Sequence, residues 1–263
     1  MNSKIYNEKD LPWAELVKLG LAAKGKLLMS QTDQEALLSG RRSSLLKLSN
    51  IAEGSFHIGE IDLKLSLKPD GKGKLQLQAH PINRYPETPI GLEEYEANQL
   101  ISGEKMLIYK KLKDAKSEPY EAIFEYDPET REFVKTDPQK IIVPEKVNSE
   151  QLSLEQREDY RQGKEVKLAE GTNFRYTGVD PDPIRSERLL IIASILVDGG
   201  LTYLAFQGIK TLAGFINKNP KAAIETEGYL AAKKEMELHN AQPQTIKPAS
   251  EQDRSYTRSG RSR

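Results

Sequence analysis

The chain contains no cysteine among its 263 residues, which excludes disulfides, thiolate nucleophiles and cysteine-ligated metal sites. Apolar residues make up 37% and aromatic residues 7%, so the core is small for this length. The 39 basic and 39 acidic residues cancel, which argues against a protein that coats nucleic acid through its overall charge. These absences exclude several classes of function, so the evidence for function must come from local patterns in the sequence.

Catalytic and metal-binding motifs are also scarce. The three histidines, His57, His80 and His239, are far apart and show no metal-ligand spacing. The segment 70–74 has the glycines of a hairpin turn and lacks the spacing of a phosphate-binding loop. We therefore expect no catalytic, metal-binding or cofactor-binding residues, no cofactor and no small-molecule substrate. The start of the chain lacks the apolar run of a secretory signal, so a cytoplasmic location is expected.

The periodicity of apolar residues predicts an α+β protein with four regions. Residues 1–50 are expected to form a basic helical module, because Trp13, Leu16 and Val17 recur at helical spacing. Residues 51–183 are expected to be rich in antiparallel strands, because apolar and polar residues alternate there, as in 61–67. Residues 184–240 are predicted to hold an apolar helix or helical hairpin and then a charged helix. Residues 241–263 lack apolar periodicity and are predicted to be a disordered basic tail.

A helix–glycine–strand pattern occurs three times. The glycines are Gly40, Gly103 and Gly163, which lie 63 and 60 residues apart. Each is preceded three residues earlier by an apolar or aromatic residue and is expected to end a short helix in the left-handed conformation. The pairs Thr32/Glu35, Gly91/Glu94 and Ser153/Gln156 are the expected helix starts. A duplicated module and a common way to turn the chain both explain the pattern.

The apolar segment 189–216 is the strongest anomaly of the sequence. It is apolar on every side, and its window 189–209 has 21 residues, enough to cross a bilayer as a helix. Asp198 near the middle opposes insertion, and Asp198-Gly199-Gly200 would instead break the segment into two packed helices. Membrane association, a buried helix and a self-association surface all remain open. The residues predicted to carry such a role are Leu190, Ile191, Ile195, Asp198, Gly199, Gly200 and Leu204.

A second candidate surface is the basic N-terminal region, which has a net charge of +3 over residues 1–50. Two helices joined near a glycine are typical of helix-turn-helix geometry, and a solvated basic face of a small bundle explains the same pattern. The residues predicted to contact nucleic acid are Lys24, Lys26, Arg41, Arg42 and Lys47.

Several stretches resemble an uncharacterised family of Bacteroidetes, the DUF3945/DUF4099-like domains of unknown function. The resemblance is carried by segments 12–21, 37–46, 143–148, 156–166 and 186–200. It includes Leu38-Ser39-Gly40-Arg41-Arg42 and Val197-Asp198-Gly199-Gly200 and extends over most of residues 10–215. Relatives are often encoded on conjugative or mobilisable elements, and the family supplies no catalytic residues. The resemblance therefore implies an accessory role in a mobile genetic element.

Taken together, these patterns predict a non-enzymatic accessory binding or scaffolding protein of a mobile genetic element. Its main expected partner is another protein. DNA, a membrane and a second copy of the chain are further expected partners. One alternative is a component of a conjugative transfer apparatus attached to the inner membrane by residues 189–209. The other is an enzyme whose site is assembled only in the folded chain.

Overall fold

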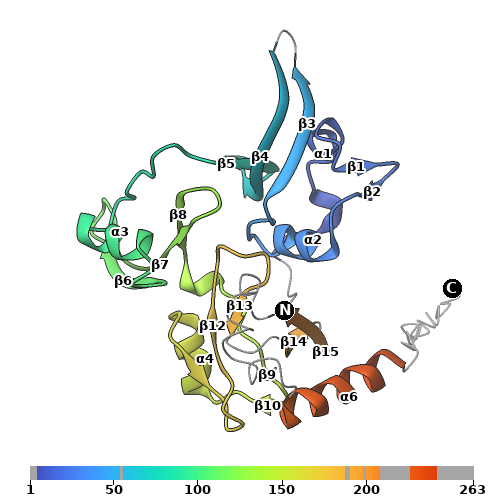
Figure 1. The fold of residues 1–263 in the computed structure, drawn as a ribbon, viewed down its shortest axis with the longest axis vertical. Coiled ribbons are helices and arrows are strands. Elements are labelled where there is room, and N and C mark those ends of the chain that lie inside the picture. The colour runs from blue at the N-terminus through green and yellow to red at the C-terminus, as the bar shows by residue number, and fades with distance from the viewer. Residues whose placement is uncertain (1–4, 54–55, 187–189, 198–199, 208–225, 242–263) are drawn as a thin grey trace, which may run out of the picture.

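The computed structural model describes residues 5–53, 56–186, 190–197, 200–207 and 226–241 (Figure 1). Helices and antiparallel sheets are both present, which confirms the α+β class. The expected tail, 241–263, lies outside the described residues except for Ala241.

Three units of the same build follow one another along the chain. Each has a short helix that ends near a glycine and then a three-stranded antiparallel meander. The first unit has α2 (Gln31–Leu38), β3 (Leu46–Glu53), β4 (Phe56–Pro69) and β5 (Leu75–Pro81). The second has α3 (Glu94–Ile101), β6 (Ile108–Lys113), β7 (Pro119–Asp127) and β8 (Glu132–Thr136), and the third has α4 (Leu154–Arg161), β11 (Val166–Lys167), β12 (Asn173–Tyr176) and β13 (Ile184–Ser186). The internal repetition predicted from the glycine spacing is therefore present as repeated structure.

The remaining elements lie before, between and after these units. They are the 3-10 turns η1 (Glu8–Asp10) and η2 (Pro138–Lys140), the helices α1 (Trp13–Lys18) and α6 (Glu227–Ala241), and the strands β1 (Ala22–Ala23), β2 (Lys26–Leu27), β9 (Lys146–Val147), β10 (Glu150–Gln151), β14 (Leu190–Val197) and β15 (Gly200–Gln207). Together α1, β1 and β2 extend the first unit, whose leucine-rich core they share.

The three repeated helices end as the sequence predicts. Gly40, Gly103 and Gly163 have φ of 70°, 75° and 74°, a conformation that other residues adopt only with strain. In the first and third units the backbone N–H that follows the glycine returns to the helix, from Arg41 to Ala36 and from Lys164 to Asp159, each at 2.8 Å. This closure satisfies helix carbonyls that would otherwise lack a partner.

The predicted helix starts are correct for one unit. Ser153 accepts a hydrogen bond from the backbone N–H of Gln156, whose side chain accepts one from the Ser153 N–H, so this capping box is confirmed. The first start is wrong by two residues, because Ser30 is the N-cap and its hydroxyl accepts from the Asp33 N–H. The second is also shifted by two, because a capping box is closed by Glu93 and not by Gly91.

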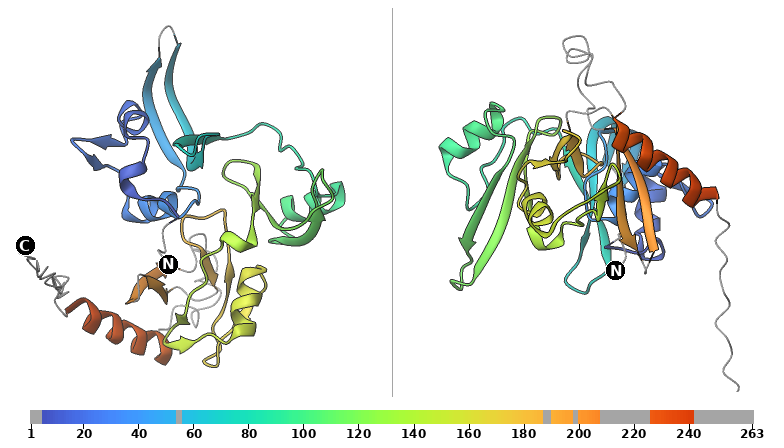
Figure 2. Two further views of the ribbon diagram at one scale, coloured as in Figure 1. Left: turned by 180° about the vertical axis from the view of Figure 1, so that it is seen from behind. Right: turned by 90° about the horizontal axis from the view of Figure 1, so that it is seen from below.

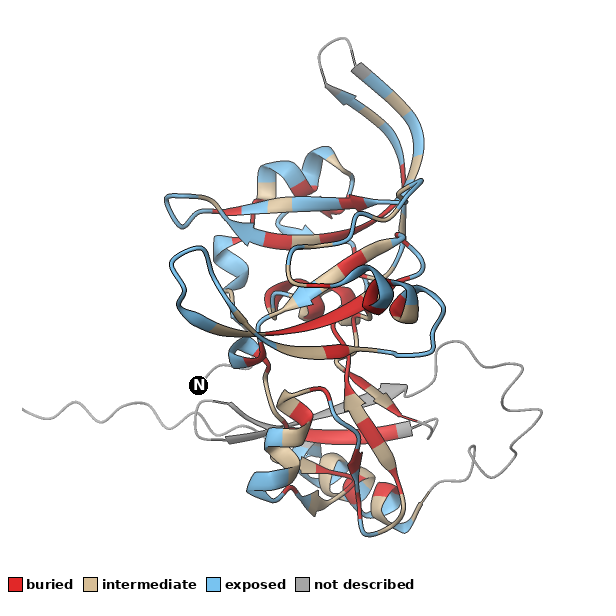
Figure 3. Cartoon of the chain, turned by 90° about the vertical axis from the view of Figure 1, so that its left-hand side faces the viewer, coloured by how far each residue is buried: buried red, intermediate tan, exposed pale blue. Residues whose placement is uncertain are grey.

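Each unit has an apolar core between its helix and its sheet. In the first unit Leu37 of α2 packs with Leu63 and Leu65 of β4. Since side chains of a strand alternate, Lys64 and Ser66 lie on the opposite face of β4. The distal parts of β3 and β4 extend away from the rest of the molecule as a two-stranded arm that is mostly exposed or intermediate (Figure 3). The polar face at the base of this arm is the one that faces the other two units.

The second and third units share buried surface through β7. Phe124 belongs to the core under α3, while Ile123, its neighbour on the opposite face, packs in the core of the third unit. In the third unit, Tyr160 of α4 lies against Phe174 and Tyr176 of β12, with ring centroids 5.8 and 5.9 Å away. The two units are therefore packed against each other through the middle of a sheet.

The expected apolar helix of the C-terminal region is wrong. Leu190 and Ile195 lie in β14, and Gly200 and Leu204 lie in β15, which pairs antiparallel with β14. The order β10-β9-β14-β15 makes β14 an inner strand of its sheet. Asp198, Gly199 and residues 208–216 lie outside the described residues.

Burial on both faces explains why the sequence around Ile191–Ala193 is apolar on every side. Ile191 and Ala193 pack in the core of the third unit, and Ile192 packs against Tyr229 and Ala232 of α6. Figure 2 shows α6 alongside the β14–β15 hairpin. A strand covered on both faces has a continuous apolar run and no alternation. Within the described ranges, no helix combines the length and apolar composition needed to cross a bilayer. Membrane association and self-association stay predictions.

Candidate functional site

A cleft of about 1020 Å³ lies where the three units meet. The first unit contributes α2, the Gly40–Arg42 segment, β4 and β5, the second contributes β8 and the chain that follows it, and the third contributes Tyr176 and the 181–183 segment. Two of these strands, β5 and β8, are at the edges of their sheets. No single unit contains the cleft, so its shape depends on how the units are held together.

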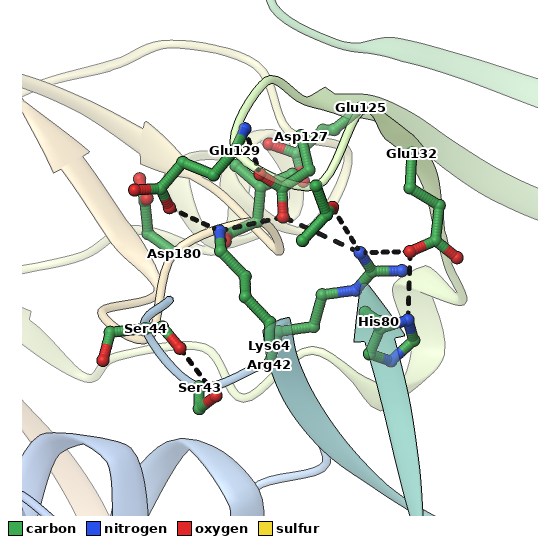
Figure 4. A network of polar contacts seen from close by, with 12 residues as sticks. Arg42, Ser43, Ser44, Lys64, His80, Glu125, Asp127, Glu129, Glu132 and Asp180 are labelled. Carbon is green, nitrogen blue, oxygen red and sulfur yellow. Dashed lines mark hydrogen bonds and ion pairs between the residues drawn. The ribbon is translucent and has the colours of Figure 1, made fainter. Parts of the chain in front are cut away.

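A buried lysine joins all three units (Figure 4). Lys64 of β4 is 1% exposed, and its Nζ lies 2.8 Å from Oδ2 of Asp127 and 2.8 Å from Oε2 of Glu129, both in the second unit. The same ammonium group donates to the carbonyl oxygen of Val179 in the third unit at 2.9 Å. The lysine thus has one hydrogen bond and two carboxylates of opposite charge, and such pairing is the condition under which a buried charge is tolerated.

A buried arginine strengthens the contact between the first two units (Figure 4). Nη1 of Arg42 lies 2.8 Å from Oε2 of Glu132 and 3.7 Å from Oδ2 of Asp127. It also donates to the hydroxyl of Thr130 at 3.4 Å. Arg42 is thus a structural cation that orients two carboxylates of the second unit.

Ser66, His80 and Glu132 form a hydrogen-bonded chain on the wall of the cleft. Oγ of Ser66 lies 2.8 Å from Nε2 of His80, and Nδ1 of His80 lies 3.0 Å from Oε2 of Glu132. All three residues line the cleft, and His80 itself is 5% exposed. Partial burial acts to raise the pKa of Glu132, but the hydrogen bond from His80 and the charge of Arg42 outweigh it and lower that pKa to about 2. Glu132 is therefore a carboxylate at neutral pH and can accept the Nδ1 proton of His80.

A second buried carboxyl joins the second and third units. Glu125 of β7 is 3% exposed and accepts hydrogen bonds from the Gly178 N–H at 2.6 Å and from the Thr177 hydroxyl at 2.8 Å. Burial raises the pKa of Glu125 to about 7, although these two hydrogen bonds and the charge of Arg185 oppose the rise. This carboxyl changes charge near neutral pH.

Glu125 predicts a pH dependence of stability. Because its pKa is higher in the folded chain than the ordinary value of 4.5, its protonated form stabilises the fold. That contribution is fully present below about pH 4.5 and is lost as the pH rises through about 7. In Glu125→Gln, where a neutral amide replaces the acid, this loss should be absent. Urea unfolding of both proteins from pH 4.5 to 8.5 measures the difference, and an unchanged gap between them across this range would contradict the assignment.

The residues predicted to contact nucleic acid do not form one surface. Arg41 and Arg42 lie at the cleft, where Arg41 donates to the carbonyl oxygen of Pro181 at 2.5 Å and Arg42 is held in the ion network. Burial lowers the pKa of Arg41. Lys24 and Lys26 are exposed at the β1–β2 hairpin, and Lys47 is exposed on β3, 2.9 Å from Glu60. DNA binding stays a prediction.

The sequence-based reasoning missed the residues that build the site. Lys64, Asp127 and Glu132 were not among the expected functional residues, and His80 was noted only as an isolated histidine. Among the residues that the structure describes, no group of three or more histidine, aspartate and glutamate side chains could hold a metal ion.

The fold and site define a class of protein: tandem α+β repeats that share one cleft and are joined by buried ions. Residues 6–89, which contain the first unit, match the family described as a protein of unknown function, DUF4099. The expected family resemblance is confirmed for this part of the chain, and the association with mobile elements stays a prediction. Neither the curated proteins nor the solved structures gave a match.

Proposed function

We propose that the protein is an accessory binding protein that holds an extended segment of a partner protein in the cleft between its three units. The observation that carries this proposal is the position of two edge strands, β5 and β8, on the walls of one cleft. An edge strand directs every second N–H and C=O group away from its neighbour, and an extended peptide can pair with these groups as an added strand.

β8 is the better of the two edges for this role. Its residues Glu132, Val134, Lys135 and Thr136 all line the cleft, and among the described strands it pairs with β7 alone. The apolar residues Ile141 and Ile142 also line this cleft. Backbone pairing would supply affinity, and these apolar surfaces would supply contacts for alternate side chains of the peptide.

One exposed lysine at the cleft favours an acidic side chain in the bound peptide. Arg42 is paired with Glu132, and Lys140 lies 3.9 Å from Asp137, so these charges are locally balanced. Lys68 is an exposed cation at the cleft, with no acidic partner within salt-bridge distance among the described residues. Lys135 also lines the cleft, but its ammonium group donates to the Tyr120 hydroxyl at 3.0 Å on the other face of β8. A rim charge of this kind steers association and selects between partners more than it adds affinity.

A substitution that fills the cleft tests the proposal. Peptides would first be selected on the full chain from a random-peptide phage library, and the best one titrated by calorimetry. Thr32→Trp places a bulky side chain on the α2 wall of the cleft and should weaken binding at least tenfold. Gln31→Trp, at the exposed neighbouring position, is the matched control and should bind as the wild type does. Equal affinity of all three proteins would contradict binding in the cleft.

The partner is proposed to be a component of the same mobile genetic element. This part of the proposal rests on the family resemblance of the chain.

Nuclear magnetic resonance tests whether the peptide binds as an added strand. Amide signals of β8 that shift on addition of the selected peptide would support strand addition, while unchanged β8 signals with bound peptide would contradict it.

A further inference from the structure

We propose that Ser66, His80 and Glu132 form an acyl-transfer site that hydrolyses carboxylic esters entering the cleft. The inference goes beyond peptide binding and does not depend on it. It corresponds to the expected alternative of an enzyme whose site is assembled only in the folded chain. These residues are separated in the sequence and are brought together only by the packing of the first unit on the second.

The order of the three groups is that of a nucleophile, a base and an orienting acid. The distances of 2.8 Å from Oγ of Ser66 to Nε2 of His80 and 3.0 Å from Nδ1 of His80 to Oε2 of Glu132 are within the range expected for such a chain. The two imidazole nitrogens are used in the productive sense, with the acid on Nδ1 and the hydroxyl on Nε2. Many polar residues could form two such hydrogen bonds. A serine, a histidine and a carboxylate linked in this order on a cleft wall are the arrangement that activates a hydroxyl group.

The strands fix this geometry without a flexible loop. Ser66 lies opposite Gln78 in the β4–β5 ladder, and His80 lies opposite Lys64, so Ser66 and His80 are diagonal neighbours on one face. Oε2 of Glu132, the oxygen that faces His80, also lies 2.8 Å from Nη1 of Arg42. Arg42 is therefore a positioning residue that keeps the carboxylate aimed at His80.

The protonation states suit the reaction. Glu132 is ionised at neutral pH and is an acceptor for a proton on Nδ1 of His80. In the tautomer with its proton on Nδ1, Nε2 is the acceptor that faces the Ser66 hydroxyl. A buried imidazole held in this tautomer acts as a general base for the adjacent hydroxyl.

The reaction balances with water as the only co-reactant. Oγ of Ser66 bonds to the carbonyl carbon of the ester while its proton passes to Nε2 of His80. The bond from that carbon to the alcohol oxygen then breaks, and the alcohol leaves with the proton from His80. Water, deprotonated by His80, bonds to the acyl carbon, the bond to Oγ breaks, and Ser66 recovers its proton. Glu132 stays ionised and stabilises the imidazolium in both halves.

Gln78 is the candidate donor to the developing oxyanion. It lies directly across the β4–β5 ladder from Ser66 and lines the same cleft. A side-chain amide N–H at such a position can stabilise the negative charge of the tetrahedral intermediate. Gln78→Ala should therefore lower the rate of ester hydrolysis while leaving Ser66 and His80 in place.

A fluorophosphonate probe, which bonds to activated serine hydroxyls, tests the site directly. In the folded full chain, mass spectrometry of the digested protein should find the probe on Ser66. Unfolding the chain in urea should abolish this labelling, because the activation depends on the fold. Labelling absent from Ser66 in the folded protein, or equally fast in urea, would overturn the proposal without the need for any variant.

Variants then separate catalysis from structure. Hydrolysis of p-nitrophenyl butyrate should fall at least ~100-fold in Ser66→Ala and in His80→Gln, which keeps hydrogen-bonding groups but loses the base. Ser49→Ala, which removes a hydroxyl from β3 of the same sheet, should retain the wild-type rate. Circular dichroism shows that each variant is folded. Folded Ser66→Ala with wild-type hydrolysis would refute the site, and this outcome is independent of whether Thr32→Trp weakens peptide binding.

Discussion

Replacement of Lys64 with methionine is expected to lower the free energy of unfolding by about 3 kcal/mol. Methionine is similar in length and fills the same space, so the main change is the loss of the charge. Asp127, which is fully buried, would lose its closest cation, and the Val179 carbonyl would lose its donor. Arg42 remains 3.7 Å from Asp127 and Glu129 is half exposed, which keeps the loss at the lower end of the range for breaking a buried ion pair. Urea unfolding, followed by the fluorescence of Trp13 and by circular dichroism, measures it.

Two further variants identify the cause of this loss. Lys47→Met removes an exposed lysine that pairs with Glu60, and it should change stability by less than about 1 kcal/mol. Combining Lys64→Met with Asp127→Leu removes the buried lysine and the buried aspartate together. It should recover much of the loss, because the remaining partner, Glu129, is half exposed and can be solvated. If Lys64→Met unfolds at the wild-type urea concentration, the buried lysine does not hold the units together.

The repeated units could be predicted from the sequence because their signals are local. A glycine that must adopt a positive φ and an apolar residue three positions earlier occupy one helical turn, so they appear in a short window. Leu37, Leu100 and Tyr160 are indeed all buried. The alternation in β4 likewise places Leu63, Leu65 and Leu67 in the core and directs Lys64 and Ser66 to the other face.

The apolar region was predicted as helical because periodicity disappears when both faces of a strand are covered. Ile191, Ile192 and Ala193 are all buried, so the pattern contains no polar position that would show a period of two. The better indication of a hairpin is the short connection between the two apolar runs. Asp-Gly between two apolar runs of a sequence is typical of a hairpin, and the flanking residues Val197 and Gly200 are paired in the structure. Asp198 opposes membrane insertion as a charge, and as the first residue of an Asp-Gly pair it also favours a hairpin connection.

The site could not be predicted because its residues belong to different units. The strand pattern predicts that Ser66 and His80 lie on the same polar face of the sheet. The same pattern predicts that this polar face is exposed to solvent, whereas the second unit covers it. Glu132 and Asp127 come from the next unit, and only the packing of one unit on another brings them to Arg42 and Lys64. Local periodicity contains no information on which repeated unit covers which polar face.

Replacement of Gly163 with alanine is expected to lower the free energy of unfolding by about 3 kcal/mol. Its φ of 74° costs an alanine about 1 kcal/mol. The added Cβ would also lie 2.7 and 2.9 Å from the two terminal methyl groups of Leu107 and 3.4 Å from Ile123. Leu107 must therefore move, and because its side chain is partly buried in the core of the third unit we expect a cost within the range of about 1–3 kcal/mol for overpacking.

Gly103 is the matched control because it occupies the same position in the second unit. Its φ is 75°, and an added Cβ would meet nothing within 4 Å, so Gly103→Ala should cost only the conformational strain of about 1 kcal/mol. The difference between the two variants isolates the contact with Leu107, which belongs to the second unit while Gly163 belongs to the third. Urea unfolding of both variants measures this difference. Equal losses would mean that Leu107 yields freely and that the junction between these two units is loosely packed, whereas a larger loss for Gly163→Ala means that the repeated helix end has become part of the contact between units.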